Sequence, residues 1–379
     1  MKMQFVKSTF LGLAAATMIG VGSAAANPAL LFDINSGAVI EHQEAFMRWH
    51  PASLTKLMTA YTTFRAVQAG ELALNSPIKI SKRAAAFPPA KMGYKPGSVL
   101  TLDNALKIIM VKSANDVAAA IGENVGGSTE AFAERMNAEA RRLGMTGSHW
   151  VNANGLHDPE QYTTARDLAI LVRAIRLEYP QYESYFDIEG IIAGKAKLKN
   201  FNPLVGRFPG TDGMKTGFVC ESGFNLIASA SRDGRTLAAI VLGATSPDDR
   251  AEDAAKMLQG GFGRNGSSMS VMGLVPYGDN RDIVTNMREA VCSPKAKHAA
   301  SDGPAPTEAG SAPEKVSIIP EMTRPRSWVT VSLGGATGPV PKALAGRDLV
   351  EQADVPLPTW RPDMPAPAGA APLATKARS

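Results

Sequence analysis

The sequence has few of the residues that build metal and cofactor sites. Its 379 residues include two cysteines and five histidines, and the histidines show no H-x-x-x-H or comparable spacing of metal ligands. We therefore predict neither a metal nor another cofactor. The formal net charge is only +5, and no basic stripe interleaved with aromatic residues is present. So small a charge gives no reason to expect nucleic acid as a partner, although it suits an anionic polymer.

The chain also has little that could cross a membrane. An apolar run at residues 11–21 is too short to span a bilayer comfortably. Lys2 and Lys7 precede this run and Ala24-Ala25-Ala26 follows it. This order is typical of a cleavable signal peptide, here residues 1–26, with an uncleaved anchor helix as the alternative. We therefore expect export.

Export would place Cys220 and Cys292 in a compartment that permits disulfides. Their spacing is consistent with a bridge between them and equally with two free thiols. The pairing stays open at this point.

Composition divides the rest of the chain into three regions. Residues 27–268 carry regular apolar patterns and predict one folded domain, followed by a connecting segment at 269–293. Residues 294–379 are rich in Pro, Ala, Gly and Ser, so we predict a largely disordered tail without a clear membrane anchor. Stretches at 316–319 and 328–333 could form isolated strands, but they are too short for a second domain.

Apolar patterns of period two lie at both ends of residues 27–268, and helical patterns lie between them. The predicted strands are 30–33, 38–41, 214–219, 224–231 and 236–243. The predicted helices are 53–69, 102–111, 116–126, 130–143, 168–177 and 250–262. These elements predict an α+β fold, in which an antiparallel sheet built from both chain ends carries an inserted helical lobe.

Three short motifs occur in the order Ser53-Leu-Thr-Lys56, Ser113-Ala-Asn115, Lys215-Thr216-Gly217. A serine hydroxyl is a poor nucleophile at neutral pH, so it needs a nearby base and help for the oxyanion. Lys56 follows Ser53 by three residues and shares its helix face. A lysine beside a second cation, here Lys215, can act as that base. Alone, Ser53 could be a helix N-cap and Lys56 a solvated lysine, but the full set favours catalysis.

Together with residues 51–59, 154–156, 212–217 and 223–230, these motifs resemble the serine-type D-alanyl-D-alanine carboxypeptidases. These enzymes are low-molecular-mass penicillin-binding proteins of the S11 peptidase family. The resemblance covers roughly residues 28–262 and implies a β-lactamase/DD-peptidase-like fold. It also implies removal of the terminal D-Ala from peptidoglycan stem pentapeptides through an acyl-enzyme, covalent inhibition by β-lactams, and a role in cell-wall maturation and cell shape.

The resemblance assigns the catalytic roles. Ser53 would be the nucleophile, Lys56 its base, and Ser113 the relay that carries a proton toward the leaving amine. The backbone N–H groups of Ser53 and Phe218 would form the oxyanion hole. Asp167 also matches a recurrent segment, but we interpret it as a cap of the following helix.

Substrate binding is implied for five further positions. Asn115 would bind the substrate amide, Lys215 and Thr216 its carboxylate, and Gly217 would let the acyl chain approach the backbone. Arg250 would help to hold the terminal carboxylate, although the residues just before it depart from the family pattern.

Three other functions remain alternatives. A class A β-lactamase needs a Glu-x-x-Leu-Asn segment, and residues 114–214 contain none. A D,D-endopeptidase uses the same machinery, so motifs separate it poorly from a carboxypeptidase. A non-catalytic wall-binding scaffold would not need the intact motif set. We expect a periplasmic protein whose partners are stem peptides.

Overall fold

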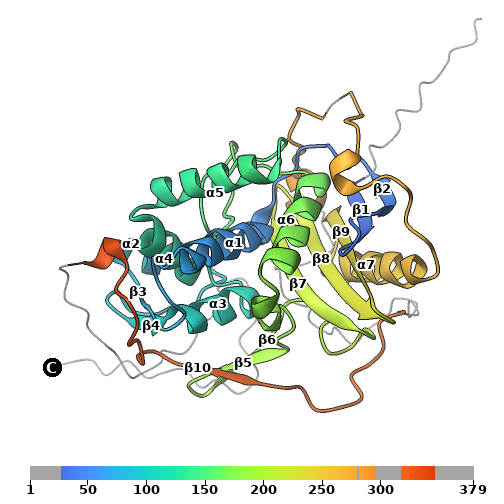
Figure 1. Ribbon diagram of the computed structural model, residues 1–379. Coiled ribbons are helices and arrows are strands. Elements are labelled where there is room, and N and C mark those ends of the chain that lie inside the picture. Colours follow the sequence, from blue (N-terminus) through green and yellow to red (C-terminus); the bar gives the residue numbers. More distant parts are fainter. Residues whose placement is uncertain (1–26, 280, 295–316, 346–379) are drawn as a thin grey trace, which may run out of the picture.

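The computed structural model describes residues 27–279, 281–294 and 317–345. The predicted signal peptide and most of the predicted tail lie outside these residues. A sheet layer and a helical lobe lie side by side (Figure 1). Within the three described ranges, no helix is long and apolar enough to span a membrane.

Both ends of the domain contribute to one five-stranded antiparallel sheet. Its strands are β1 (Ala29–Asp33), β2 (Val39–Gln43), β7 (Thr211–Val219), β8 (Gly223–Arg232) and β9 (Arg235–Ala244). Their order is β2-β1-β9-β8-β7, so β1 joins the N-terminal hairpin to the three later strands and β7 lies at the edge. The predicted α+β fold with a sheet from both chain ends is confirmed.

Alternation along the strands gives this sheet two apolar faces, because successive strand residues point to opposite sides. On β9, Leu237 and Ala239 pack in the core beneath α7 (Pro247–Phe262). Ala238 and Ile240 instead belong to the larger core shared with the helical lobe. Figure 1 shows α7 and the lobe on different sides of the sheet. The period-two pattern therefore positions β7 and β8 between two packed layers.

The lobe is made of the helices between β2 and β7. They are η1 (Ala52–Leu54), α1 (Thr55–Gln68), α2 (Lys82–Ala86), α3 (Leu102–Val111), α4 (Asn115–Gly126), α5 (Thr129–Leu143), α6 (Ala165–Glu178) and η2 (Pro180–Tyr185). Eleven of the 14 residues of α1 are buried, because α3, α4, α5 and α6 surround it.

Side-chain caps begin several of these helices. Thr101 caps α3, as its position in the sequence predicts, by accepting from the Asn104 N–H at 3.1 Å. The expectation that Asp167 caps α6 is wrong, because Thr164 is the cap and accepts from the Asp167 N–H. The Asp167 carboxylate accepts instead from Ser148, at 2.8 Å, and from other neighbours. The Asp167 carboxylate thus connects α6 to the loop that precedes this helix.

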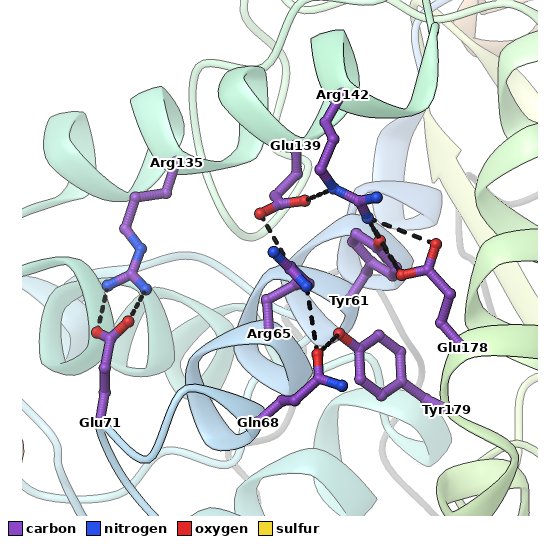
Figure 2. Close-up of polar contacts among 9 residues, drawn as sticks. All are labelled: Tyr61, Arg65, Gln68, Glu71, Arg135, Glu139, Arg142, Glu178 and Tyr179. Carbon is purple, nitrogen blue, oxygen red and sulfur yellow. Dashed lines mark hydrogen bonds and ion pairs between the residues drawn. The ribbon is translucent and has the colours of Figure 1, made fainter.

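A polar network joins α1, α5 and α6 (Figure 2). Arg142 donates to Glu139 at 2.6 Å and to Glu178 at 3.1 Å. Glu139 also accepts from Arg65 of α1, and Glu178 accepts from Tyr61 of the same helix at 2.7 Å. Glu139 and Glu178 each accept hydrogen bonds from two side chains on different helices. The network therefore holds α1 against α5 and α6 at the lobe surface.

Five short strands were not predicted from the sequence as members of this domain. They are β3 (Pro77–Lys79), β4 (Val99–Thr101), β5 (Gly190–Ala193), β6 (Ala196–Lys199) and β10 (Val329–Val331). β10 comes from the predicted tail and pairs in parallel with β5. Its pairing partner is more than 130 residues away in the sequence, so local patterns could not show it.

The prediction of a disordered tail is therefore wrong for residues 317–345. This strap, as we call the segment, is fixed by single side chains rather than by a periodic face. Ile319 is buried in the core beneath α7, and Arg324 forms an ion pair with Glu189. At the end of the strap, η4 (Lys342–Leu344) packs against α4.

The predicted connecting segment, residues 269–293, also folds onto the domain. It contains η3 (Val271–Gly273) and α8 (Arg288–Cys292). Cys292 forms a disulfide with Cys220, just past the end of β7, across 72 residues of sequence. The structure thus decides the pairing that spacing left open.

Candidate active site

The three motifs meet where the sheet joins the lobe. Ser53 lies in η1 and Lys56 in the first turn of α1. Ser113 and Asn115 lie at the junction of α3 and α4, and Lys215 lies on β7. The site is thus assembled from η1, α1, the α3–α4 junction and β7.

Ser53 and Lys56 form the first pair of the site. The Lys56 Nζ lies 2.9 Å from the Ser53 Oγ. The lysine is fully buried, and its Nζ also donates to the Asn115 Oδ1 at 3.0 Å and to the Asn154 carbonyl. These partners hold the Lys56 amine beside the half-buried Ser53 hydroxyl. An activated serine needs a proton acceptor in this position.

Ser113 and Lys215 form the second pair. The Lys215 Nζ donates to the Ser113 Oγ at 3.0 Å and to the Thr216 carbonyl at 3.0 Å. Both Ser113 and Lys215 are 1% exposed. Ser113 has a φ of +59°, in the left-handed region that non-glycine residues rarely adopt. Such strain is kept only where the surrounding structure demands it, and here it turns the hydroxyl toward β7.

Asn115 links the two halves of the site. Its Oδ1 accepts from Lys56, and its Nδ2 donates to the Pro88 carbonyl at 3.1 Å. Its backbone N–H donates to the Ala90 carbonyl at 2.7 Å. The side chain that we expect to bind substrate therefore also orients the base and holds the loop that contains Pro88 and Ala90.

Gly217 allows a close approach of η1, and the predicted approach of the acyl chain stays a prediction. A Cβ at this position would lie 3.0 Å from the Pro51 carbonyl oxygen and 3.0 Å from the Ser53 nitrogen. The absent side chain thus lets η1 dock on β7. Next to it, the half-buried Phe218 stacks on Phe224 with ring centroids 4.2 Å apart. The N–H groups named for the oxyanion hole lie on these two docked segments.

Arg250 lies behind β7 and is 1% exposed. Its guanidinium donates to the carbonyls of Gly217 and Asn225, each at 3.2 Å. These hydrogen bonds support the two strands, and the contact of Arg250 with substrate that the resemblance implies stays a prediction. Thr216, also 1% exposed, stands beside Lys215 on β7 as predicted.

Three further residues shape the site; the sequence analysis used their segments for the resemblance but assigned no role to the residues themselves. The Asn154 carbonyl accepts from Lys56, and Gly155 has a φ of +82°. Asn225 donates from its side chain to the Pro51 carbonyl at 3.3 Å. The Asn-Gly dipeptide at 154–155 is a local signal for such a turn, although it does not indicate contact with a distant lysine.

Asp116 holds the neighbouring loop. Its buried carboxylate accepts from the N–H groups of Met92 and Gly93 at 2.9–3.1 Å. Burial raises the pKa of Asp116 above its ordinary value. The backbone hydrogen bonds from Met92, Gly93 and Val117 oppose this rise only in part. The carboxylate therefore fixes the loop that also contacts Asn115.

The family comparison matches this geometry. Residues 15–246, more than half of the chain, match the family model for D-alanyl-D-alanine carboxypeptidases of the S11 peptidases. The chain belongs to this family. All the motif residues discussed above lie within the match except Arg250, which is four residues beyond it. The S11 assignment made from the three motifs is therefore confirmed.

Individual S11 relatives agree with this membership. The D-alanyl-D-alanine carboxypeptidase DacF of Bacillus subtilis (strain 168) is 32% identical over 245 residues, which are 62% of this chain and 62% of the relative. The crystal structure of penicillin-binding protein 5 from Haemophilus influenzae superposes with a TM-score of 0.60 at 31% identity, covering 63% of this chain and 71% of that one.

A third comparison is with penicillin-binding protein D2 from Listeria monocytogenes in its cefotaxime-bound form. It gives a TM-score of 0.57 at 29% identity, covering 63% of this chain and 97% of that one. The chain spans about three fifths of the length of the curated relatives it matches. Its S11 domain is thus shared, while the rest of those relatives is not matched.

Proposed function

We propose that the chain is a serine D-alanyl-D-alanine carboxypeptidase. In this proposal it removes the terminal D-Ala from peptidoglycan stem pentapeptides in the periplasm, after cleavage of a signal peptide, and contributes to wall maturation and cell shape. The observation that carries the proposal is the 2.9 Å contact between Ser53 and a fully buried Lys56, beside the Ser113–Lys215 pair. Family membership supports the same reaction class.

The proposed reaction begins at Ser53. Its Oγ attacks the carbonyl carbon of the penultimate D-Ala while neutral Lys56 takes the hydroxyl proton. The backbone N–H groups of Ser53 and Phe218 stabilise the oxyanion. As the C–N bond breaks, the Ser113 hydroxyl gives its proton to the leaving amine of the terminal D-Ala and is reprotonated with the proton that Lys56 took from Ser53. Water then attacks the acyl carbon and gives a proton to Lys56, which returns it to the Ser53 Oγ as the ester bond breaks and the shortened peptide leaves.

Substrate position follows from the edge strand. β7 is bonded on one side by β8, so an extended peptide can add to its other edge. Lys215 and Thr216 would hold the terminal carboxylate, and Asn115 would hold the amide. β-Lactams would occupy the same place and acylate Ser53, in keeping with the cefotaxime-bound relative.

Mass spectrometry of muropeptides tests the proposal. The purified chain is incubated with monomeric pentapeptides and with crosslinked dimers. We expect loss of one D-Ala from the monomers and a fall of roughly 10⁴-fold or more in Ser53→Ala. Ser332→Ala, an exposed serine of the strap, should keep the wild-type rate. Cleavage of dimers alone would assign an endopeptidase, and no change in either substrate would favour a scaffold.

A further inference from the structure

Residues 281–294 run along the chain that leads to the nucleophile. Arg48 forms an ion pair with Asp282 at 3.0 Å. Trp49 makes a parallel β-bridge with Thr285. The segment thus touches the stretch that ends, a few residues later, at η1.

The C-terminal part of the same segment contacts the turn after β7. The Met287 N–H donates to the Glu221 carbonyl at 2.9 Å, and the Arg288 Nε donates to the Glu221 carboxylate at 3.0 Å. Glu221 is only 5% exposed, and Arg288 forms an ion pair with it, while the His157 Nε2 lies 3.9 Å from the same carboxylate. The Cys220–Cys292 disulfide closes the contact covalently.

Trp49 connects these two places directly. Its indole Nε1 donates to the Ser222 carbonyl, in the turn after β7, at 2.9 Å. The ring is 1% exposed, and a Cβ on Gly243 of β9 would lie 2.3 Å from it, so the indole packs directly against Gly243. Residues 281–294 therefore contact both Trp49 and the turn after β7, which are also hydrogen-bonded to each other.

The catalytic geometry depends on η1 and β7, the two elements that follow Trp49 and precede the turn at Ser222. η1 holds Ser53, β7 holds Lys215, and the two elements meet at Gly217, where an added Cβ would lie 3.0 Å from the Ser53 nitrogen. A small shift of β7 relative to η1 would move the oxyanion-hole N–H groups and the Lys215–Ser113 pair away from Ser53. Misplacement of this kind by about 1 Å can cost about 100-fold in rate.

We propose that residues 281–294, closed by the Cys220–Cys292 disulfide, are a brace that positions β7 against η1 for acylation of Ser53. Cys220, Glu221 and Cys292 are positioning residues in this scheme, since they act through β7. The inference rests on the proposed function for its kinetic consequence. Its structural consequence, restricted motion of β7 and of the chain before η1, does not depend on that function.

The test compares three variants with the wild-type chain. Cys220→Ser/Cys292→Ser opens the brace, and Glu221→Gln removes the buried charge while keeping the disulfide. Arg135→Ala is the control, because it removes a two-point ion pair with Glu71 elsewhere in the lobe (Figure 2). Each protein is measured at the same interval below its own Tm, for acylation by a fluorescent penicillin and for amide hydrogen exchange of residues 47–54 and 211–222.

We expect acylation to slow by about 10- to 100-fold in the double variant and by a smaller factor in Glu221→Gln, with faster exchange in both peptides. Arg135→Ala should change neither readout. A double variant with a lower Tm but wild-type acylation and exchange would overturn the brace. If the wild-type chain is not acylated and releases no D-Ala, the proposed function fails, and hydrogen exchange alone decides the brace. If the double variant does not fold, Glu221→Gln decides it.

Discussion

At the scale of single residues, the site is built from backbone conformations that cost free energy. Ala52 and Ser113 have φ values of +48° and +59°, although both carry a side chain. Left-handed backbone costs an L-residue roughly 1–2 kcal/mol. One precedes the nucleophile and the other is the proposed proton relay, so the strain lies where two hydroxyls must be aimed. The buried lysines that contact them, Lys56 and Lys215, hold these hydroxyls in place.

Gly155 offers a sharp test of this packing. A Cβ there would lie 1.9 Å from the Ala52 carbonyl oxygen, and its φ of +82° is unsuited to alanine. We expect Gly155→Ala to lower the free energy of unfolding by about 2–3 kcal/mol and to slow acylation at least tenfold, because Ala52 must shift beside Ser53. Urea denaturation and fluorescent-penicillin labelling measure both effects.

The matched control for this substitution is Gly260→Ala. Gly260 lies in α7 with no atom within 4 Å of an added Cβ, so alanine should raise the free energy of unfolding by about 0.5–1 kcal/mol. Acylation should stay at the wild-type rate. Equal effects of the two substitutions on acylation would contradict the close approach of Gly155 to Ala52.

At the scale of elements, the strap is attached through Glu189, which immediately precedes β5. The carboxylate of Glu189 accepts from Arg324 and from the Ser327 N–H at 2.8 Å, and Trp328 packs on Gly190. β10 then pairs with β5. A short Pro-rich segment has too little apolar surface to dock by burial alone, so this buried carboxylate directs it to one place.

Acid should weaken this attachment. Burial by itself raises the pKa of Glu189, but the hydrogen bonds from Arg324 and Ser327 outweigh it and hold the pKa below its usual 4.5. A lowered pKa stabilises the fold above the ordinary value, and this contribution is lost as the pH falls through the folded-state pKa. We therefore expect wild type to be more stable than Glu189→Gln near pH 7.

The difference between wild type and Glu189→Gln should shrink toward zero as the pH falls below about 4.5. Urea midpoints measured from pH 7 to pH 3 give this difference directly. Glu134→Gln, at an exposed residue of α5, controls for the general effect of removing one carboxylate. A gap between wild type and Glu189→Gln that stays constant over this range would contradict the assigned ion pair.

At the scale of the whole molecule, the sequence predicted what local patterns encode. Alternation in β8 and β9 and the caps of the long helices were enough for the α+β fold, and the three motifs were enough for the meeting of Ser53, Lys56, Ser113 and Lys215. The strap, the position of Arg250 behind β7 and the contact of Asn154 with Lys56 were not predicted. Each depends on partners distant in sequence, and none has a periodic signature.

The disulfide is the clearest of these long-range features, and its effect on the whole domain can be measured. Cys220 and Cys292 close a loop of 72 residues, for which the chain-entropy argument gives a loss of about 4 kcal/mol in the free energy of unfolding when the bond is removed. Urea denaturation of the wild-type chain with and without dithiothreitol should therefore show a lower midpoint in the reduced form. The Cys220→Ser/Cys292→Ser variant should match that reduced form and ignore the reductant. Identical midpoints for oxidised and reduced wild type would mean that the noncovalent contacts of residues 281–294 already restrict the chain as fully as the bond does. The stability of this junction would then rest on noncovalent contacts such as those of Arg48, Trp49 and Glu221.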